Sequence, residues 1–370
     1  QGFGSAIPQV AAALGPTPRL ALRATLPDRI EMLTLEGAAL NVTAEGAVGE
    51  TLDATLRATV ADLAPLVPGL AGGLRAELRA TGPRDDPSIA LTAQGERLER
   101  EGQVLEALAL DLRVATPLSA PRAEGTLRAS YAGLPVTLDL RGLPDGSALR
   151  IEALTAGFGP ARLAAHGLLD PQAATFVGEA SLDVPELAPF AAIAGTPMSG
   201  SAAMRATLDL RDGVQGFDVS LDVPQASIGG TPLGGTLKAA GTLAALEATL
   251  EARAQDARLT LQARVSEDGA ARRVEVPELL LRRGADSLRL AAPARILVAA
   301  DGGVTIEALA LTTSRGGTLR AEGRWGPEQA DLRATLAALP VAGLAALASP
   351  GLAAEGSISG EARVTGPVGD

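Results

Sequence analysis

The sequence predicts an all-β protein in which an elongated, curved or rolled sheet is built from repeats. Many short segments alternate apolar and polar residues, glycine-containing turn pairs separate them, and one longer cassette recurs three times. No linker or shift in composition divides the chain, so we expect one repetitive β region over residues 1–370. Because the chain opens with Gln1, we expect it to be an internal segment of a longer protein.

Hydrophobic residues recur at every second position in the predicted strands, with Arg, Asp, Glu, Thr and Ala between them. Such alternation gives a strand one apolar face and one polar or mixed face. The apolar positions of the predicted strands are Leu52, Leu56, Val60, Leu74, Leu78, Leu108, Leu110, Leu112, Val114, Val136, Leu138, Leu140, Leu259, Leu261, Val265, Leu288, Leu290, Leu309, Leu311, Leu332 and Leu336.

Glycine-containing pairs mark the expected hairpins between these strands. They are Asp145-Gly146, Asp212-Gly213, Asp268-Gly269, Asp301-Gly302 and Gly316-Gly317. Such pairs adopt the positive φ angles that tight hairpin turns need. Successive turns are roughly 8–15 residues apart, which is typical of a meander or sandwich of short strands.

The recurring cassette is an uncharged apolar stretch that leads into an alternating strand. The stretches begin at Leu63, Leu187 and Leu339, and the strands are expected at Leu74–Gly82, Ala203–Leu210 and Ser357–Gly366. With their flanks, the repeats lie near 53–87, 179–210 and 331–367. Proline and glycine interrupt the stretches, so we expect short amphipathic helices or turns that lie on the sheet rather than membrane spans.

The composition favours a trough over a filled core. Hydrophobic residues make up 46% of the chain, but aromatic residues only 2%. β-domains of this size normally fill their cores with aromatic rings, because each ring buries a large area. Alanine is expected to face inward at Ala54, Ala58, Ala76, Ala80 and Ala263, where it leaves space. We therefore predict a curved sheet with room inside it.

Charge and cysteine content exclude several classes of function. The net charge is −11 and no basic cluster with interleaved aromatic residues occurs, so we expect no nucleic-acid partner. The chain has no cysteine, which excludes disulfides and thiolate metal sites. We predict no cofactor, no metal and no small-molecule substrate.

No catalytic constellation stands out. His166 is the only histidine, and Ser181, Asp170 and Asp183 near it lack a nucleophile-elbow pattern. No phosphate-binding loop with its lysine occurs. We therefore predict that the chain is not an enzyme. Carboxylates on neighbouring strands could still form the site of a polysaccharide-acting β-helix enzyme, and this alternative stays open.

The cassette carries a resemblance to a known family. The order of alternating strands, an apolar Leu-rich stretch with proline and a further strand in Asp53–Pro87 resembles the TamB family. That family is the inner-membrane subunit of the bacterial translocation and assembly module, within the AsmA-like and bridge-type lipid-transfer proteins. Looser copies are Glu179–Leu210 and Asp331–Pro367, and the strands of Ala123–Gly142 and Gly316–Leu336 are similar in style.

The resemblance implies a long periplasmic sheet rolled into a tube with a lengthwise opening. It implies an inner-membrane anchor outside this segment and an outer-membrane barrel of the Omp85 type, TamA-like, as a partner that regions outside this segment contact. The implied work is phospholipid passage between the two membranes, assistance in outer-membrane protein assembly, or both. A trough of Leu and Val suits mobile acyl chains, since each buried methylene gains about 0.8 kcal/mol over water.

We accordingly predict that phospholipid acyl chains contact a groove of aliphatic side chains. The predicted groove residues are Leu74, Leu78, Leu108, Leu110, Leu112, Val136, Leu138, Leu140, Leu259, Leu261, Val265, Leu288, Leu290, Leu309, Leu311, Leu332 and Leu336. The alternative is a secreted or surface β-solenoid that acts as an adhesin or autotransporter passenger, with a filled interior and a functional outer face.

Overall fold

The structure is a computed structural model that describes residues 12–25, 28–115, 122–242, 244–327, 329–342 and 355–367. These residues contain 26 strands and a few short helical turns, and every strand pair with a defined register is antiparallel. The predicted all-β class is therefore confirmed. The chain forms two compact units, Gln1–Leu182 (unit 1) and Asp183–Asp370 (unit 2).

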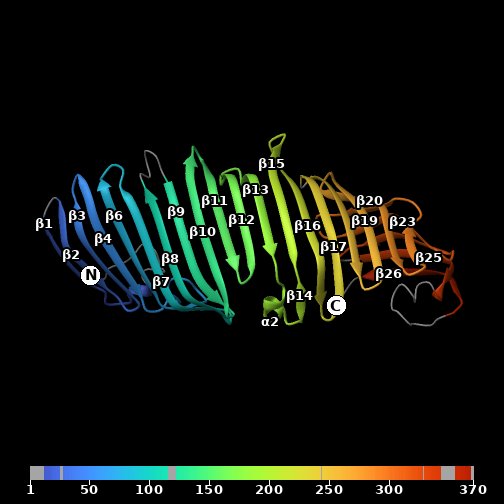
Figure 1. Cartoon of the computed structure of the whole chain (residues 1–370), viewed down its shortest axis with the longest axis horizontal. Helices are drawn as coiled ribbons and strands as arrows, with labels where there is room; N and C mark the ends of the chain where they lie inside the picture. The colour runs from blue at the N-terminus through green and yellow to red at the C-terminus, as the bar shows by residue number, and fades with distance from the viewer. Residues whose placement is uncertain are drawn as a thin grey trace. The chain divides into compact units, whose positions relative to one another are not determined.

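Unit 1 is a meander in which strands follow one another along the sheet in chain order (Figure 1). The short strand β5 and the longer strand β6 lie end to end beside β7. Both pair with β7, and β6 also pairs with β4. The strands are β1 (Arg19–Thr25), β2 (Arg29–Glu36), β3 (Leu40–Val48), β4 (Thr51–Val60), β5 (Leu70–Gly72), β6 (Leu74–Pro83), β7 (Ser88–Arg100), β8 (Gln103–Ala115), β9 (Arg122–Tyr131), β10 (Leu134–Asp145), β11 (Ala148–Phe158) and β12 (Ala161–Asp170). A further strand, β13 (Thr175–Val184), crosses into unit 2.

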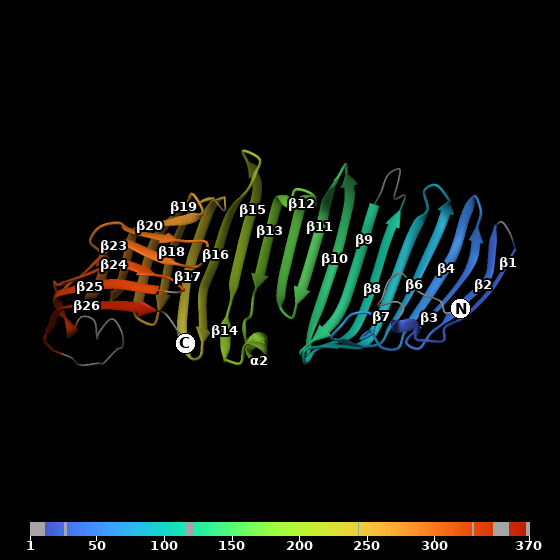
Figure 2. The same cartoon turned by 180° about the vertical axis from the view of Figure 1, so that it is seen from behind.

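Unit 2 repeats the meander, and its sheet curves back on itself. In Figure 1, β25 and β26 lie behind β19 and β20, whereas in Figure 2, seen from the other side, they lie in front. The strands are β14 (Met198–Gly200), β15 (Ala202–Arg211), β16 (Val214–Ile228), β17 (Thr231–Thr242), β18 (Ala245–Ala254), β19 (Ala257–Asp268), β20 (Ala271–Arg283), β21 (Asp286–Leu290), β22 (Ala294–Val298), β23 (Val304–Thr313), β24 (Thr318–Trp325), β25 (Gln329–Pro340) and β26 (Ser357–Pro367).

The predicted turn pairs connect successive strands. Asp212 and Gly213 have φ angles of 53° and 80° and join β15 to β16, which is the two-residue hairpin that such a pair favours. Gly146, Gly269 and Gly302 also have positive φ and lie at or between the ends of paired strands. The turn chemistry of the sequence therefore predicted the strand breaks correctly.

The strands that follow the three cassettes are also confirmed, as β6, β15 and β26. Each cassette is closed by a backbone hydrogen bond from the N–H of an apolar residue to a glycine carbonyl. The three bonds are Leu63 to Gly72 at 2.8 Å, Leu187 to Gly200 at 2.9 Å and Val341 to Gly356 at 3.0 Å. In the third copy the donor is Val341, while Leu339 belongs to β25 and pairs with Ile358. The cassettes thus share a closing geometry as well as a sequence style.

The apolar stretches of the cassettes form short helical turns and bends. The second contains the 3-10 helix η1 (Ala188–Phe190) and α2 (Ala191–Ala194), which ends at Gly195 with φ of 67°. Gly195 is suited to this left-handed position because it has no Cβ. Most of the third stretch, residues 343–354, lies outside the described residues. Within the described part of the chain, no helix has the length and apolar character that a bilayer crossing requires.

The units have little buried core. Only thirteen hydrophobic residues are buried in the described part of the chain, and six of them are alanines. The chain exposes 22062 Å², whereas a compact monomer of 37.2 kDa exposes about 14,000 Å². A single layer of sheet, whose strands pack mainly against their neighbours along the sheet, accounts for this excess.

Candidate functional site: the apolar face of each unit

The register of unit 1 aligns apolar residues into rows that run from β1 to β12 and cross every strand except the short β5. Residues directly opposite each other in an antiparallel pair project from the same face, so paired positions can be followed from strand to strand. One row is Leu22, Leu33, Ala44, Leu56, Leu78, Leu91, Leu112, Gly125, Leu140, Leu154 and Ala165. The next is Leu20, Leu35, Val42, Ala58, Ala76, Ala93, Leu110, Leu127, Leu138, Ala156 and Leu163.

Unit 2 has rows of the same kind. From β15 to β20 the paired residues are Met204, Leu221, Leu237, Leu250, Leu261 and Leu279. From β21 to β26 they are Leu290, Leu311, Leu319, Leu336 and Gly360. Each unit therefore carries one face on which aliphatic side chains continue from strand to strand, and we refer to it as the apolar face.

The structure places all the predicted groove residues on the apolar face of their own unit. Unit 1 contains Leu74, Leu78, Leu108, Leu110, Leu112, Val136, Leu138 and Leu140. Unit 2 contains Leu259, Leu261, Val265, Leu288, Leu290, Leu309, Leu311, Leu332 and Leu336. None of them is fully buried: Leu78 is 37% exposed, and the others are partly buried.

Leucines of the apolar face of unit 1 keep much of their surface in contact with solvent, both on the edge strand β1 and on the inner strands β4 and β6. Leu22 is 62% exposed, Leu56 is 38% exposed and Leu78 is 37% exposed. Exposed apolar area costs about 25 cal/mol per Å² relative to burial, so a ligand that covers these side chains gains free energy. Contiguous apolar surface of this kind marks a binding surface more often than a structural one.

The first cassette covers one edge of this apolar face. Leu63 packs with Val60 and Leu98 in a small buried cluster, and each of the three is 7–8% exposed. Leu74 and Leu108 are among the partly buried residues that pack against it. Asp62, before Leu63, accepts the N–H groups of Ala64 and Gly72 at its Oδ1 atom, at 3.2 and 3.3 Å. These two predicted groove residues therefore lie at the covered edge of the face.

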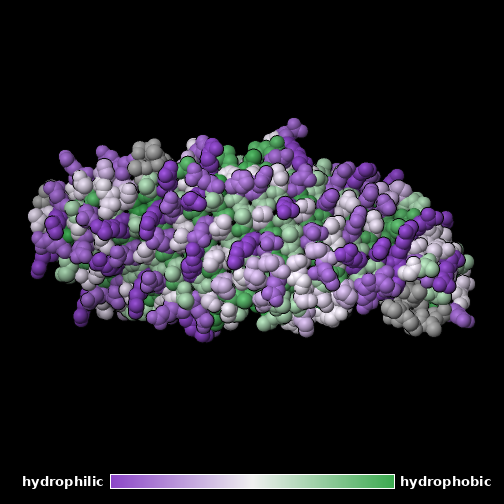
Figure 3. All heavy atoms as spheres, in the orientation of Figure 1, coloured by the Kyte–Doolittle hydropathy of each residue, from purple (hydrophilic) through white to green (hydrophobic). Residues whose placement is uncertain are grey.

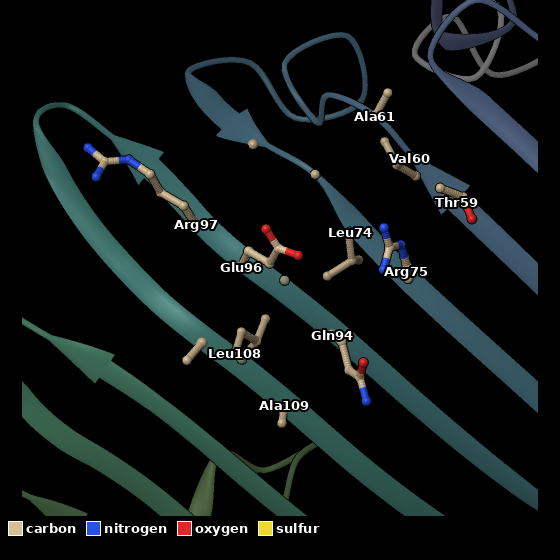
Figure 4. Close-up of a pocket in the computed structure, with 14 residues that line it drawn as sticks. Thr59, Val60, Ala61, Leu74, Arg75, Gln94, Glu96, Arg97, Leu108 and Ala109 are labelled. Atoms are coloured by element: carbon tan, nitrogen blue, oxygen red, sulfur yellow. The ribbon is translucent and has the colours of Figure 1, made fainter.

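A hollow of about 770 Å³ lies beside this cluster. Its lining comes from β4, β6, β7, β8 and the adjoining residues Ala61, Gly72 and Gly73 (Figure 4), and the glycines contribute no side chain. Val60, Leu74 and Leu108 supply apolar surface. The polar lining is Arg75, Gln94, Glu96 and Arg97, of which Arg97 pairs with Glu99 at 3.1 Å. The hollow lies at the cassette-side ends of these strands, beside the apolar rows, and the register places Arg75 and Gln94 on the face opposite to Leu74.

The opposite face of each sheet is polar and carries cross-strand ion pairs. Arg57 donates to Glu45 and to Glu77, both at 2.9 Å, and these hydrogen bonds raise the pKa of Arg57 above its ordinary value. In unit 2, Arg264 pairs with Glu247 at 3.1 Å. On the side of the molecule in Figure 3, hydrophilic side chains cover much of each unit, with smaller hydrophobic patches among them. Exposed pairs of this kind add little stability, but they keep this face hydrated.

His166, the only histidine of the chain, lies at an exposed position. The side chain of His166 is 62% exposed on β12, and its Nε2 atom lies 4.0 Å from a carboxylate oxygen of Glu179. Among the described residues, no three His, Cys, Asp or Glu side chains lie close enough together to hold a metal ion. The arrangement around His166 is that of a solvated strand residue.

One carboxylate departs from this exposed pattern. The side chain of Asp286, at the start of β21, is 8% exposed and forms two hydrogen bonds with Arg315, at 2.5 and 2.9 Å. The hydrogen bonds and the charge of Arg315 lower the pKa of Asp286, although burial opposes them. Ser314 also accepts the N–H of Ser287 at 3.0 Å, so this contact fastens the β20–β21 turn to the β23–β24 turn.

We expect Asp286→Asn to weaken the pH dependence of the stability of unit 2. Because folding lowers this pKa, the ion pair stabilises the fold above the ordinary value of 3.8, and this stabilisation is lost as pH falls below it. Urea unfolding of the wild type should lose more free energy between neutral and acidic pH than unfolding of the variant. Arg315→Gln should behave like Asp286→Asn, and equal pH slopes in all three proteins would contradict the assignment.

The predicted groove residues omit several members of the same rows. Leu22, Leu91 and Leu127 in unit 1 and Leu237 and Leu250 in unit 2 are examples. Each lies in a stretch with period-two alternation, for example the Ser88–Arg100 strand that contains Leu91. The alternation alone was therefore enough to identify these residues, and the strand register places them in the same rows as the predicted residues.

Comparisons with known proteins add no relative. No protein-family model matches the chain. No curated protein and no solved structure matches it. The likeness to the TamB family therefore rests on the sequence pattern alone.

Proposed function

We propose that the apolar faces hold phospholipid acyl chains and let them pass along the sheet, as part of a non-enzymatic bridge of the TamB type. The observation that carries this proposal is the continuity of the aliphatic rows. In unit 1 they run from β1 to β12 through every strand except the short β5. Leucines in these rows are also left partly exposed, which favours a ligand over a packed core.

Uniformity of the surface supports movement as well as binding. A lipid that moves along the protein must leave each site as readily as it enters the next, so many similar and weak contacts are better than one tight site. The rows contain almost only Leu, Ala, Val and Gly, and their contact with a chain is non-directional. No polar group in the two rows would bind one lipid position more strongly than another.

The proposal extends to location and partners through the resemblance. A bridge of this type works in the periplasm between the inner and outer membranes and meets an outer-membrane barrel of the Omp85 type. Help with outer-membrane protein assembly is part of the same proposal, since an aliphatic face can also hold the apolar side of a client strand.

Site-specific photocrosslinking tests the proposal. We would place a benzophenone amino acid at Leu138 on the apolar face, and at Thr137, which pairs with Arg128 on the opposite face, as the matched control. The purified chain is incubated with vesicles of phosphatidylethanolamine and phosphatidylglycerol and irradiated. We expect lipid adducts at Leu138 and few at Thr137, because only Leu138 lies in an aliphatic row.

Equal adduct yields at the two positions would refute acyl-chain binding on the apolar face. An unfolded outer-membrane β-barrel polypeptide can be added together with the vesicles. Preferential crosslinking of Leu138 to that polypeptide would show that the face holds a protein client rather than lipid.

A further inference from the structure

The second cassette lies against a part of the sheet that carries no charged side chain. Residues 187–204 of the cassette contain no Asp, Glu, Lys or Arg, and neither do residues 223–237, which form the turn between β16 and β17 and the adjoining ends of both strands. The two segments are in contact, because β14 pairs with the end of β16 and the N–H of Gly229 donates to the carbonyl of Pro197 at 2.9 Å. We refer to them together as the uncharged patch, and Figure 1 shows it at the lower edge of the sheet, around α2 and β14.

The uncharged patch exposes aliphatic side chains and continues the apolar face of unit 2. Ile193 on α2 is 44% exposed, and Ile228 at the end of β16 is 39% exposed. Leu233 and Leu237, a member of the apolar row, alternate along β17 and project from the same face. Leu233 is directly opposite Ala226 on β16, and Ile228 lies two positions further on. An aliphatic surface therefore runs from the row to the edge of the sheet without a charged side chain between them.

The first cassette has the same pairing but a charged neighbour. Two positions before the closing glycine, Leu70 of β5 is opposite Arg100, whereas Met198 of β14 is opposite Ile228. The turn after Arg100 adds Glu101, and both are exposed, whereas the turn after Ile228 consists of glycines. The lack of charge is therefore a property of the second cassette and its neighbour, and not of the cassettes in general.

Charged residues mark the limits of the uncharged patch. Glu186 precedes the cassette segment, and on β18 Arg253 donates to the carbonyl of Pro224. Asp256, in the turn after β18, pairs with Arg283 at 2.8 Å. The uncharged surface is therefore confined to the second cassette and the β16–β17 turn.

The uncharged patch has few hydrogen-bond donors to offer a protein partner. The N–H groups of Leu187 and Gly229 already donate to carbonyls within the patch, those of Gly200 and Pro197. Four of its residues are prolines, which have no N–H group: Pro189, Pro197, Pro224 and Pro232. Protein–protein interfaces carry about one hydrogen bond per 100–200 Å², whereas a hydrocarbon layer needs none. The patch therefore matches the uncharged layer of a bilayer better than it matches a protein surface.

We propose that the uncharged patch contacts the surface of a phospholipid bilayer and is the place where acyl chains pass from that bilayer onto the apolar face of unit 2. Exposed aliphatic side chains enter the boundary between head groups and acyl chains, whereas charged side chains there cost free energy. Because the patch continues the apolar face, a chain that enters here meets no charged turn on its way. This inference rests on the proposed function and adds the site of entry.

A fluorescent label tests the bilayer contact. Because the chain has no cysteine, single-cysteine variants can be labelled at one site only. We would attach the environment-sensitive dye NBD at Ile193→Cys, in the uncharged patch, and at Val214→Cys as the matched control. Val214 is 51% exposed and lies at the other end of β16 from the patch. Each labelled protein is mixed with phosphatidylcholine vesicles that carry a nitroxide on carbon 5 of the acyl chain.

We expect the emission of the label at position 193 to shift to shorter wavelength and to be quenched, and the label at position 214 to change little. No change at position 193, or equal changes at both positions, would overturn the bilayer contact. Lipid adducts at Leu138 would then still support acyl-chain binding on the apolar face, so failure of the contact and failure of the proposed function can be told apart.

Paired substitutions test entry at the uncharged patch. We would combine Ile193→Asp with Ile228→Asp, and, as the matched control, Leu210→Asp with Val214→Asp at the opposite edge of unit 2, where the two side chains are 48% and 51% exposed. Loading is followed by photocrosslinking of phosphatidylcholine to a benzophenone at Leu261 on the apolar face. From vesicles, the patch variant should load at least about tenfold more slowly than the control variant, because its carboxylates oppose contact with the bilayer.

Delivery of the same lipid from a cyclodextrin complex bypasses the bilayer, so both paired variants should then load at equal rates. Equal rates from vesicles would overturn entry at the uncharged patch. A patch variant that loads slowly from both sources would also overturn it, because the substitutions would then act on the apolar face itself. Circular dichroism is the check that the strands remain.

Sedimentation without vesicles distinguishes a bilayer from a second copy of the chain. We expect the wild type and the variant with Ile193→Asp and Ile228→Asp to sediment alike. A wild-type dimer that these substitutions convert into monomers would overturn the proposal, since the uncharged patch would then be an interface between two copies.

Discussion

Three aspartates in one apolar row of unit 1 are expected to lower phospholipid binding by at least about tenfold, which corresponds to about 1.4 kcal/mol. Leu110, Leu127 and Leu138 lie directly opposite one another on β8, β9 and β10 and are partly buried. Replacing all three by Asp removes aliphatic contact and places carboxylates where an acyl chain would lie, where they are poorly solvated. Binding is measured by co-migration of radiolabelled phospholipid with the purified protein.

A matched variant controls for added charge and for any loss of fold. Ala90, Ala109 and Thr137 lie on the polar face of the same region. Ala90 is directly opposite Arg79 and Arg113 on its two neighbouring strands, and Ala109 and Thr137 are each directly opposite Arg128. Replacing these three by Asp adds the same charge in a favourable setting. Lipid binding should then stay close to that of the wild type.

Two results would contradict this prediction. If both triple variants bind lipid equally well while retaining their strand content by circular dichroism, the apolar face does not carry the ligand. If both lose binding equally, net charge rather than the identity of the face controls the interaction. A selective loss in the variant of Leu110, Leu127 and Leu138 supports the proposal.

Much of the fold was predictable because β-structure has a local period of two. The strand expected at Leu74–Gly82 is β6, Leu74–Pro83, and the one expected at Ser357–Gly366 is β26, Ser357–Pro367. The alternation also assigned the faces correctly: Leu110 and Leu138 project from one face, and they are joined only through Leu127 on the strand between them. A property that each strand shows by itself can be read without knowing its neighbours.

Properties that depend on contacts between distant segments were not predictable in this way. Leu108 has the same alternation as Leu110, but it packs against the cluster formed by Leu63 and Leu98. Asp286 and Arg315 are 29 positions apart, and only the pairing of β21 with β23 brings their turns together. The sequence pattern predicts which residues share a face, but it does not predict which part of that face a cassette covers.

Gly72→Ala is expected to release the first cassette, since this glycine holds its closing hydrogen bond in a conformation that alanine rarely adopts. Gly72 has a φ of 116°, and a Cβ built on it lies 2.1 Å from the carbonyl oxygen of Arg97 on β7. Backbone strain alone costs about 1–3 kcal/mol, and the contact with Arg97 adds to it. The N–H of Leu63, which donates to Gly72, should therefore exchange with deuterium at least about tenfold faster.

Gly102→Ala separates this effect from the general cost of a positive φ. Gly102 follows β7 in the turn to β8, has a φ of 78° and has no atom within 4 Å of a built Cβ. Its replacement should cost about 1 kcal/mol through the backbone and leave the exchange of the Leu63 N–H unchanged. Equal exchange in the two variants would mean that Gly72 is an ordinary turn glycine. Faster exchange in Gly72→Ala alone would show that the close approach of Gly72 to β7 holds the cassette in place.

Gly200 closes the second cassette with a φ of 98°, and a Cβ built on it lies 2.1 Å from the carbonyl oxygen of Gln225, the same distance as at Gly72. Gly200→Ala should therefore reproduce the effect at the N–H of Leu187.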